Sequence, residues 1–561
     1  MTDRTGARIL VDQLHIQGVN HIFCVPGESY LPVLDALLDS PIRVVTNRHE
    51  SGSTFMAEAY AKLTGQPGVA IVSRGPGATN AAIGIHTAFQ DSTPLVLLIG
   101  QVGSEYLDRE AFQEIDYRRM FGPMAKWVAQ VDRADRLPEY IARAFQTATS
   151  GRHGPVVLAL PEDMLKAHAD VMDAQCHQPV HTSPSDLQLA AFRRELGKAE
   201  RPVVIVGGTG WTQAACDNLR RFAQANQLPV ACAFRHQDLF DNRNAHYIGD
   251  VGLGINPRLA QRIKDADLLI VLGARLGEVV TSRYSLIDIP RPKQALVHVH
   301  PSVEELGRVF QPSLAIAAGM NQFTSRLAMM MPIENPPWRE HLSAARADCE
   351  AWQARPPVYS HTIPKLDLWQ VLEQLRAGLP ENTLLANGAG NFAIWAHRFW
   401  RYTELHTQLA PVSGAMGYGL PAGIAAKMVA PERTVVIFSG DGDFLMTSQE
   451  LATAVQNRIG VIVIVFNNGM YGTIRMHQER SFPGRVSATG LVNPHFGLLA
   501  QSYGAFGVVV ETTDTFASAL AQAIAHTRDK RTPALIELRC DPEVITPNAT
   551  LAAMRATAKL G

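Results

Sequence analysis

Short runs of β-branched and other apolar residues recur along the whole chain, separated by stretches in which apolar residues follow a helical spacing. Because both faces of each run are apolar, the runs predict strands that are covered on both sides. Strands of this kind that alternate with helices are typical of parallel sheets in α/β proteins. The runs that we expect to form strands are 43–46, 69–73, 95–99, 156–160, 201–207, 268–272, 383–386, 434–438, 461–466 and 534–538.

The alternating pattern falls into three blocks. The first ends near residue 170 and is followed by a stretch with proline and histidine, 170–185, that we interpret as a linker. A second stretch with several prolines, 332–364, separates the second block from the third. We therefore predict three α/β domains, each a mainly parallel sheet flanked by helices, at residues 1–170, 186–331 and 365–548.

The composition disfavours several classes of partner. The 51 Lys and Arg residues balance 52 Asp and Glu residues, so no basic field attracts nucleic acid or anionic lipid. No apolar run approaches the roughly 18 residues that cross a bilayer, and the charged N-terminus lacks the apolar segment of a secretory signal. The 6 cysteines have no metal-ligand spacing and are typical of reduced thiols. We expect a cytoplasmic protein that binds neither nucleic acid nor membranes.

Polar clusters follow two of the predicted strands in the third block. Gly440-Asp441-Gly442 comes after strand 434–438, and Asn467-Asn468 ends the strand at 461–466. A helix predicted over 447–456 allows the two strands to be neighbours, so both clusters lie at one ligand-binding edge. Carboxylate and amide oxygens suit Mg²⁺, and glycines let the backbone approach phosphate closely. A tight turn is the alternative for Gly-Asp-Gly alone, but the paired clusters favour a site for Mg²⁺ and a diphosphate.

This combination resembles the thiamine diphosphate (ThDP)-dependent enzymes, whose signature is Gly-Asp-Gly followed by an Asn-Asn pair. The resemblance spans nearly the whole chain and is closest to the acetolactate synthase-like branch. It implies that Asp441, Asn468 and the main-chain carbonyl of Met470 are Mg²⁺ ligands. Because a carboxylate beside a diphosphate would repel it, we expect the Asp443 side chain to point away from the cofactor.

The first block supplies the second half of the implied site. The segments 25–28, 47–50 and 73–80 each follow a predicted strand. The resemblance implies that Glu50 hydrogen-bonds N1′ of the aminopyrimidine and favours the imino tautomer, whose 4′-nitrogen removes the C2 proton of the thiazolium. A solvated acid at a helix start is the alternative for Glu50 alone. The cofactor-binding residues that the resemblance implies are Pro26, Gly27, Glu50, Asn80, Gly388, Asn391, Gly414, Met416, Gly440, Asp441, Gly442 and Asn468.

Two glycine-rich stretches complete the implied cofactor pocket. In 412–421 the resemblance puts Met416 at the apolar wedge that bends ThDP, with the Gly414 carbonyl and the Met416 amide at the pyrimidine edge. The stretch 387–391 resembles a diphosphate-contacting loop, although acetolactate synthases usually have Gly-Gln-His-Gln there. Residues 388–393 also match the dinucleotide fingerprint GxGxxA, so a nicotinamide dehydrogenase is an alternative. The acidic strand end that this alternative requires about 20 residues further on is missing.

The substrate side of the implied site comes from residues 110–126. The resemblance puts Phe112 and Gln113 beside the reactive C2 and Lys126 near the substrate entrance, which makes Gln113 the second catalytic candidate after Glu50. Without the resemblance, Gln113 and Lys126 would be interpreted as solvated residues on a helix face. His477 stands where the biosynthetic enzymes have the Trp that selects larger acceptors, so it joins Phe112 and Lys126 as a substrate-binding candidate. His86 is interpreted as a core or interface histidine rather than a proton-transfer group.

Two stretches depart from the FAD-binding motifs of the branch. The segment 272–281 keeps Arg275 but lacks the Asp-Asp-Arg that follows it in the branch. Residues 252–257 read Gly-Leu-Gly-Ile-Asn-Pro where the branch has Gly-Met-His-Gly. ThDP and Mg²⁺ are therefore the expected cofactors, and FAD is not.

The resemblance implies a lyase or transferase that decarboxylates a 2-oxo acid and joins the remaining fragment to a second carbonyl. Formation of acetolactate and CO₂ from two pyruvates is the specific expectation. The alternatives are a simple 2-oxo acid decarboxylase or a carboligase for another 2-oxo acid or aldehyde. A non-catalytic ThDP-fold paralogue is an alternative of another class, which the retention of Glu50, Asp441 and Asn468 disfavours. In the family, the active sites lie between chains, so we expect a homodimer or a homotetramer.

Overall fold

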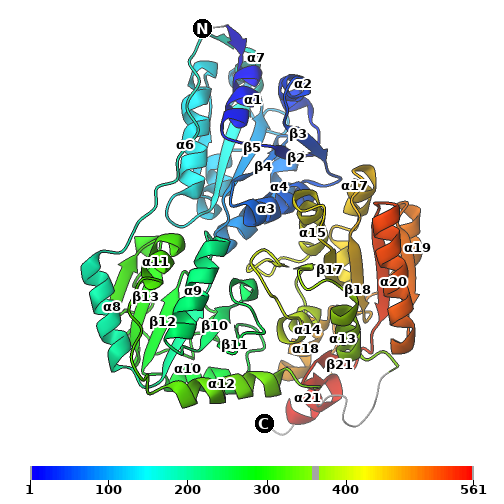
Figure 1. The fold of residues 1–561 in the computed structure, drawn as a ribbon. Coiled ribbons are helices and arrows are strands. Elements are labelled where there is room, and N and C mark those ends of the chain that lie inside the picture. Colours follow the sequence, from blue (N-terminus) through cyan, green and yellow to red (C-terminus); the bar gives the residue numbers. More distant parts are fainter. Residues whose placement is uncertain (1–2, 357–364, 559–561) are drawn as a thin grey trace.

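The computed structural model describes residues 3–356 and 365–558, and it contains three parallel six-stranded sheets flanked by helices (Figure 1). Every apolar run that the sequence predicts as a strand contains one. The predicted α/β fold class is therefore confirmed. Each sheet with its covering helices is called here the first, central or third body.

The first body is built on a sheet whose strand order is β3-β2-β4-β5-β7-β6. Its helices α1, α2 and α6 cover one face, and α3 and α4 cover the other. A two-stranded ribbon, β1 with β8, ties the chain start to the end of this body. The elements are β1 (Arg4–Thr5), α1 (Gly6–Ile16), β2 (His21–Cys24), α2 (Leu31–Leu38), β3 (Arg43–Thr46), α3 (Glu50–Thr64), β4 (Gly68–Val72), α4 (Gly75–Asp91), β5 (Leu95–Gln101), α5 (Tyr117–Phe121), β6 (Trp127–Gln130), α6 (Leu137–Thr149), β7 (Pro155–Pro161), α7 (Glu162–Lys166) and β8 (His168–Ala169).

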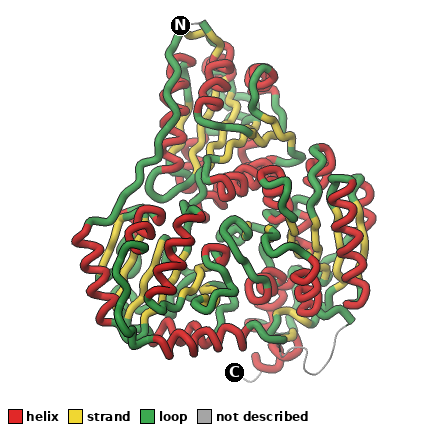
Figure 2. The backbone as a smooth tube through the Cα atoms, viewed as in Figure 1, coloured by secondary structure: helices red, strands yellow, loops and turns green. Residues whose placement is uncertain are grey.

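The central body has the strand order β11-β10-β9-β12-β13-β14. The predicted linker before it contains neither helix nor strand and runs along the outside to α8 (Figure 2). The elements are α8 (Asp186–Lys198), β9 (Pro202–Val206), α9 (Gln213–Ala225), β10 (Val230–Ala233), β11 (Tyr247–Val251), α10 (Pro257–Asp265), β12 (Leu268–Leu272), β13 (Ala295–His300), β14 (Leu314–Ala317), α11 (Met320–Leu327) and α12 (Arg339–Trp352).

The third body has the strand order β16-β15-β17-β18-β20-β19. A short antiparallel pair, β21 with β22, and a last helix follow its sheet. The elements are α13 (Leu368–Gly378), β15 (Leu384–Asn387), α14 (Phe392–Phe399), β16 (Gln408–Leu409), α15 (Gly419–Val429), β17 (Val435–Gly440), α16 (Asp441–Leu445), α17 (Glu450–Gln456), β18 (Ile462–Asn467), α18 (Gly472–Ser481), α19 (Phe496–Ser502), β19 (Phe506–Val510), α20 (Thr513–Asp529), β20 (Ala534–Arg539), β21 (Val544–Thr546), β22 (Ala549–Thr550) and α21 (Leu551–Ala558).

Two segments differ from the sequence prediction. The proline-containing stretch 332–364 is not only a linker, because it contains α12, which buries Leu342, Ala345 and Cys349 against the central body. The third domain was predicted to end at residue 548, but a further helix, α21, follows this position and packs against α18. The helix predicted over 447–456 is present as α17 and begins at Glu450. The limits of the three domains remain predictions.

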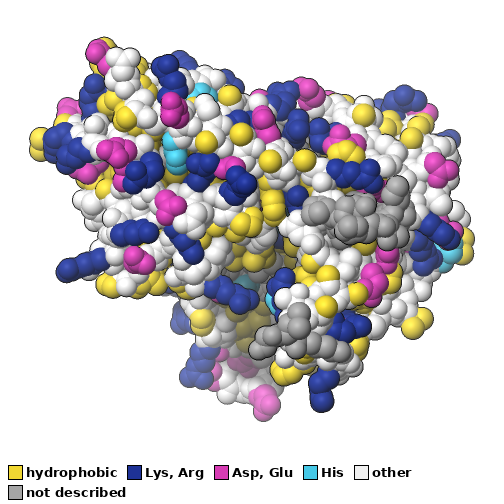
Figure 3. Space-filling view, turned by 90° about the horizontal axis from the view of Figure 1, so that it is seen from below, with side chains coloured by type: hydrophobic (Ala, Val, Ile, Leu, Met, Phe, Trp, Pro, Cys, Tyr) yellow, Lys and Arg dark blue, Asp and Glu magenta, His cyan; other side chains and the backbone are white. Residues whose placement is uncertain are grey.

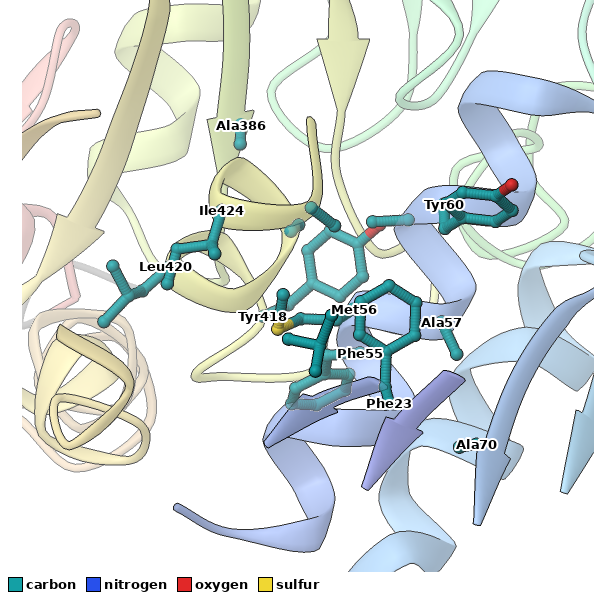
Figure 4. Close-up of a cluster of buried hydrophobic side chains, with 14 of the residues drawn as sticks. Phe23, Phe55, Met56, Ala57, Tyr60, Ala70, Ala386, Tyr418, Leu420 and Ile424 are labelled. Carbon is teal, nitrogen blue, oxygen red and sulfur yellow. The ribbon is translucent and has the colours of Figure 1, made fainter. Parts of the chain in front are cut away.

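A continuous apolar core joins the first and third bodies. Helix α3 packs against α15 as well as against its own sheet, and the buried cluster extends from Phe23 and Phe55 through Tyr418 and Ile424 to the third sheet (Figure 4). Burial of this apolar surface holds the two bodies in one arrangement. The loops that carry the candidate site residues therefore have fixed positions relative to this core.

The surface agrees with the balanced charge of the sequence. Acidic and basic side chains are interspersed over the face seen in Figure 3. No helix within residues 3–356 and 365–558 combines the length and the apolar character that a membrane span requires.

Candidate active site

A cavity of about 230 Å³ opens at the carboxyl edge of the third sheet. Its position follows from the topology: the chain leaves β15 toward β16 on one side and β17 toward β18 on the other, so the two loops diverge and leave a crevice. The sequence-predicted residues that line this cavity are Asn391, Gly414, Met416, Gly440, Asp441, Gly442, Asn468 and Met470.

Asp441 is a buried carboxylate with no basic partner among the ion pairs of the described residues; its exposed fraction is 3%. Burial raises its pKa above the ordinary value, against the opposing effect of the N–H groups that it accepts from. Oδ1 accepts from Gly442 N at 2.9 Å, and Oδ2 accepts from Gly469 N and from Asn493 Nδ2, both at 2.8 Å. These donors orient the carboxylate, and its charge calls for a cation in the cavity.

The two adjacent asparagines face opposite environments. Asn468 lines the cavity, whereas Asn467 is buried and donates to Glu537 Oε1 at 2.7 Å beneath the sheet edge. Only one of the pair can therefore offer an oxygen to a ligand. Together with the Asp441 carboxylate and the carbonyl of Met470, Asn468 supplies the hard oxygen donors that Mg²⁺ prefers. The residues present fit that ion.

Asp443 lines the same cavity, and its carboxylate is engaged by two main-chain N–H groups. Its Oδ1 accepts from Gly417 N at 2.8 Å and from Ala389 N at 3.1 Å, and a Cβ at Gly388 would collide with the same carboxylate. Burial raises the pKa of Asp443 to about 6. Gly388 does not line the cavity itself; its absence of a side chain lets Asp443 hold two cavity loops together.

The candidates of the first body gather at the edge where β2 and β4 diverge. Asn80 Nδ2 donates to Glu50 Oε2 at 2.9 Å, and the Gly77 backbone lies against the same carboxylate. Pro26 and Gly27 follow β2 at this edge, where a Cβ at Gly27 would strike Ser73. The structure therefore brings together the residues that the sequence assigned to the pyrimidine half.

The third body fixes the position of Glu50. Glu450 of α17 is fully buried and accepts from the main-chain N–H groups of Arg48 and His49 at 3.1 and 3.0 Å. These groups immediately precede α3, whose first residue is Glu50. A buried carboxylate at a helix start satisfies free N–H groups and stabilises the helix dipole.

The two halves do not meet within one chain. Among the described residues, none from the first body lines the cavity that holds Asp441. The Glu50 side chain is partly exposed, and Asn80 is its side-chain donor among the residues that the structure describes. The Glu50 group and the Asp441 cavity are thus each assembled within the chain, but they do not form one joint site there.

The substrate-side candidates have different surroundings. The Gln113 carbonyl accepts from Gly75 N at 2.9 Å and the Phe112 carbonyl from Arg74, which brings this segment to the start of α4 beside Gly77. The Phe112 side chain is 73% exposed. Lys126 instead donates to the Thr147 and Ser150 carbonyls at the end of α6, and burial lowers its pKa to about 8.

The two histidines that the sequence analysis singled out, His86 and His477, are both exposed. His477 lies on α18, four residues beyond Thr473, which lines the cavity, so both occupy one face of the helix. Partial burial, together with Arg480 and Arg283, lowers the pKa of His477. His86 is on the exposed side of α4, so its interpretation as a core residue is wrong, and an interface role remains a prediction.

Sequence reasoning missed several residues at the cavity. Asn493 holds both Asp441 and Asn467, and Thr473 Oγ1 donates to Asn391 Oδ1 at 3.0 Å. Tyr471 fills the space that a side chain at Gly442 would need. None of these residues belongs to a spacing motif, so the sequence contains no signal that singles them out.

Three family models match the chain in succession. They describe the N-terminal TPP binding domain, the central domain and the C-terminal TPP binding domain of thiamine pyrophosphate enzymes, over residues 4–120, 189–327 and 388–538. The chain belongs to the thiamine pyrophosphate enzymes. Thiamine pyrophosphate is another name for ThDP, so the resemblance found in the sequence is confirmed. Membership decides against the nicotinamide dehydrogenase alternative.

Individual thiamine pyrophosphate enzymes are similar over nearly their whole length. The chain is 31% identical to the acetolactate synthase isozyme 2 large subunit of Escherichia coli (strain K12), with 92% of each chain covered. It is 30% identical to the probable acetolactate synthase large subunit of Methanocaldococcus jannaschii, over 97% of this chain and 93% of that one. It is 32% identical to the acetolactate synthase large subunit of Parasynechococcus marenigrum (strain WH8102), over 95% and 87%.

Proposed function

We propose that the protein uses ThDP and Mg²⁺ to decarboxylate a 2-oxo acid and to join the remaining fragment to a second carbonyl, with two pyruvates giving acetolactate and CO₂. The observation that carries the proposal is the buried carboxylate of Asp441, which forms no ion pair within the described part of the chain and lies in a glycine-lined cavity at the switch point of the third sheet. Acetolactate synthases among the similar proteins support this choice of reaction.

In this proposal the third body holds the charged end of the cofactor. Asp441, Asn468 and the Met470 carbonyl bind the Mg²⁺, and the cavity glycines leave main-chain N–H groups accessible to the diphosphate. Gly414 and Met416 would contact the pyrimidine. The chemistry that ThDP would supply when bound is an electron sink for the decarboxylation.

Glu50 has the proton-handling role. Its carboxyl would hold a shared proton at N1′ of the aminopyrimidine, and Asn80 keeps the carboxyl oriented through Oε2. Gln113 and Phe112 lie next to the start of α4 and line the substrate side. Lys126 is the weakest member of this set, because two carbonyls at the end of α6 already engage its ammonium group.

The active unit in this proposal is a homodimer or a dimer of dimers. Glu50 and Asp441 belong to half-sites that do not share a cavity in one chain, and a second copy would complete each of them. We place the protein in the cytoplasm, where its 6 cysteines, all of them free thiols here, remain reduced.

The proposal is tested with purified protein, ThDP, Mg²⁺ and a panel of 2-oxo acids, by measuring CO₂ release and the mass of each product. Pyruvate should give acetolactate. Release of CO₂ with an aldehyde as the product would support the simple decarboxylase, and a different ligation product would support another carboligase. No turnover of any 2-oxo acid despite bound ThDP would favour the non-catalytic paralogue.

The purified protein is expected to be colourless. Arg275, the residue of the FAD motifs that this chain retains, is paired with Glu305 at 3.2 Å and donates to the Gln90 carbonyl. The Asp-Asp-Arg that should follow it is missing. An absorbance spectrum of the protein and of its denatured supernatant checks this, and a yellow preparation that releases one flavin per chain would contradict it.

Replacing His477 by tryptophan is expected to raise the preference for 2-oxobutyrate over pyruvate as acceptor. A Trp face offers apolar contact to the additional methylene, which contributes ~1–3 kcal/mol in a closed pocket and less at an exposed position such as this one. We therefore expect a shift of up to about tenfold. Competition between the two acceptors, with both products quantified, measures the ratio.

The unaltered protein should show no strong preference between these acceptors, because a histidine offers a polar edge. A wild-type ratio far in favour of 2-oxobutyrate would place the selecting contact elsewhere. His495→Trp, on the separate helix start at α19, is the matched control and should leave the ratio unchanged.

A further inference from the structure

The loop 410–418, which carries Gly414 and Met416, contains neither helix nor strand. Such a loop usually obtains its shape from its own turns. Here its main-chain N–H and carbonyl groups bond to buried or part-buried side chains that come from all three bodies. The side chains that hold it are Lys62, Asp91, Arg235 and Asp443.

Asp91 holds the centre of the loop from the first body. Its Oδ2 accepts from Val412 N and its Oδ1 from Ser413 N, each at 3.0 Å, and the residue is 3% exposed. Asp91 is the last residue of α4, where the helix dipole disfavours a negative charge. Asp91 therefore does not stabilise α4 through the helix dipole. Its hydrogen bonds to the loop explain why an acidic residue stands at this position.

Lys62 neutralises this carboxylate and bonds to the loop itself. Its Nζ lies 2.5 Å from Asp91 Oδ2 and 2.9 Å from Glu58 Oε1, and it donates to the Ala410 carbonyl at 3.1 Å. Burial alone would lower the pKa of Lys62, but the two carboxylates raise it above the ordinary value. The ammonium group therefore stays charged between them.

The far end of the loop is fixed by Tyr418. Its hydroxyl donates to Glu58 Oε2 at 2.6 Å, and its ring packs against Phe55 with the ring centres 5.4 Å apart (Figure 4). Burial raises the pKa of Glu58, while Lys62 opposes this effect. Both ends of the loop are thus anchored on α3, with Gly414 and Met416 between them.

Arg235 brings the central body into the same arrangement. It is buried, and its two terminal nitrogens donate to the carbonyls of Pro411 and Gly388, the latter at 3.1 Å. Asp443 joins the same two loops by accepting from Gly417 N and Ala389 N. The pyrimidine-side loop and the diphosphate-side loop are therefore held at a fixed separation.

We propose that Asp91, Lys62 and Arg235 are positioning residues that fix the loop 410–418, so that Gly414 and Met416 meet the pyrimidine of the cofactor in the required orientation. None of their bonds in the structure goes to the residues assigned to Mg²⁺. The inference rests on the proposed function, because it assigns the loop to the pyrimidine and not to the diphosphate.

The test compares two ligands by calorimetry in the presence of Mg²⁺: ThDP and inorganic diphosphate. In Asp91→Asn the amide has one acceptor oxygen instead of two, so either Val412 N or Ser413 N loses its partner and Lys62 loses a counter-charge. Affinity for ThDP should fall about tenfold or more, because a buried hydrogen bond to a charged group is lost. Affinity for inorganic diphosphate should stay within about twofold, since the metal ligands are untouched.

Asp348→Asn is the matched control. Asp348 is a part-buried carboxylate of the central body that accepts from Arg258 and Arg262, away from the loop. It should bind both ligands as the unaltered protein does. Thr87→Val removes only the 3.1 Å contact between Thr87 Oγ1 and Ser413 Oγ, and a smaller loss of ThDP affinity alone is expected.

If Asp91→Asn lost affinity for ThDP and for inorganic diphosphate equally, the residue would merely join the bodies. If its affinity for ThDP were unchanged, the loop would need no such support. Either result overturns the proposal. Should Asp91→Asn not fold, Thr87→Val decides it by the same comparison, because Thr87 bonds to the loop 410–418 through Ser413. Wild-type protein that binds neither ligand would overturn the proposed function instead, and this inference with it.

Discussion

Replacing Asp441 by alanine is expected to abolish retention of ThDP while the fold persists. The carboxylate is the single negative charge among the proposed ligands, and without it a Mg²⁺ would face the diphosphate with neutral protein oxygens only. Loss of a supporting group around a metal site costs 10- to 100-fold in affinity, so loss of the ligand itself should exceed about 100-fold. Folding should survive, because removal of a buried charge that has no basic partner among the described residues relieves a desolvation cost, which offsets the loss of the acceptor for Gly442 N, Gly469 N and Asn493 Nδ2.

Gel filtration followed by measurement of bound ThDP tests this, with circular dichroism as the check on folding. Asn493→Ala is the graded control, since it removes one donor to Asp441 Oδ2 but no proposed ligand. It should weaken ThDP binding less than Asp441→Ala does. Undiminished ThDP affinity in Asp441→Ala would remove the metal assignment.

Replacing Glu50 by glutamine is expected to leave ThDP bound but to slow the reaction by roughly 10²- to 10⁴-fold, the usual contribution of a positioned acid or base. The amide has almost the same shape, and its carbonyl oxygen can still accept from Asn80. It cannot share a proton with N1′ of the aminopyrimidine. Exchange of the C2 proton of bound ThDP for deuterium should therefore slow in proportion to turnover.

Glu28→Gln is the matched control for this experiment. Glu28 is an exposed carboxylate at the same edge of the first sheet, at the start of the turn after β2. Its amide variant should exchange the C2 proton at the wild-type rate. If Glu50→Gln also exchanged at that rate, Glu50 would have no part in proton transfer.

The sheets were predictable because their strands carry their own signal. Runs such as 268–272 and 461–466 are apolar on both faces, and a parallel strand between two helix layers requires that pattern wherever it stands in the chain. Helix α12 escaped prediction because prolines flank it and few of its positions are buried, Leu342, Ala345 and Cys349. Its apolar periodicity is too sparse to outweigh the neighbouring turn signals.

The position of a candidate site residue could be predicted only where a sequence motif directly follows a predicted strand. Gly440-Asp441-Gly442 follows its strand directly, so its place at the sheet edge could be derived. The orientation of Asn467 toward Glu537 and the contacts of Asn493 depend on pairs far apart in sequence. The same holds for Asp91 and Arg235, whose partners lie 321 and 176 residues away. Such contacts leave no periodic pattern along the chain.

The separation of Glu50 from the cavity of Asp441 has a genetic consequence. If a neighbouring copy completes each half-site, an allele that has lost only Glu50 and an allele that has lost only Asp441 are each null but complement one another in the same cell. A mixed dimer then combines both defects in one of its sites and leaves the other site intact. Two alleles that each lost a residue of the same half-site, Asp441 and Asn468 for example, could not rescue each other in this way.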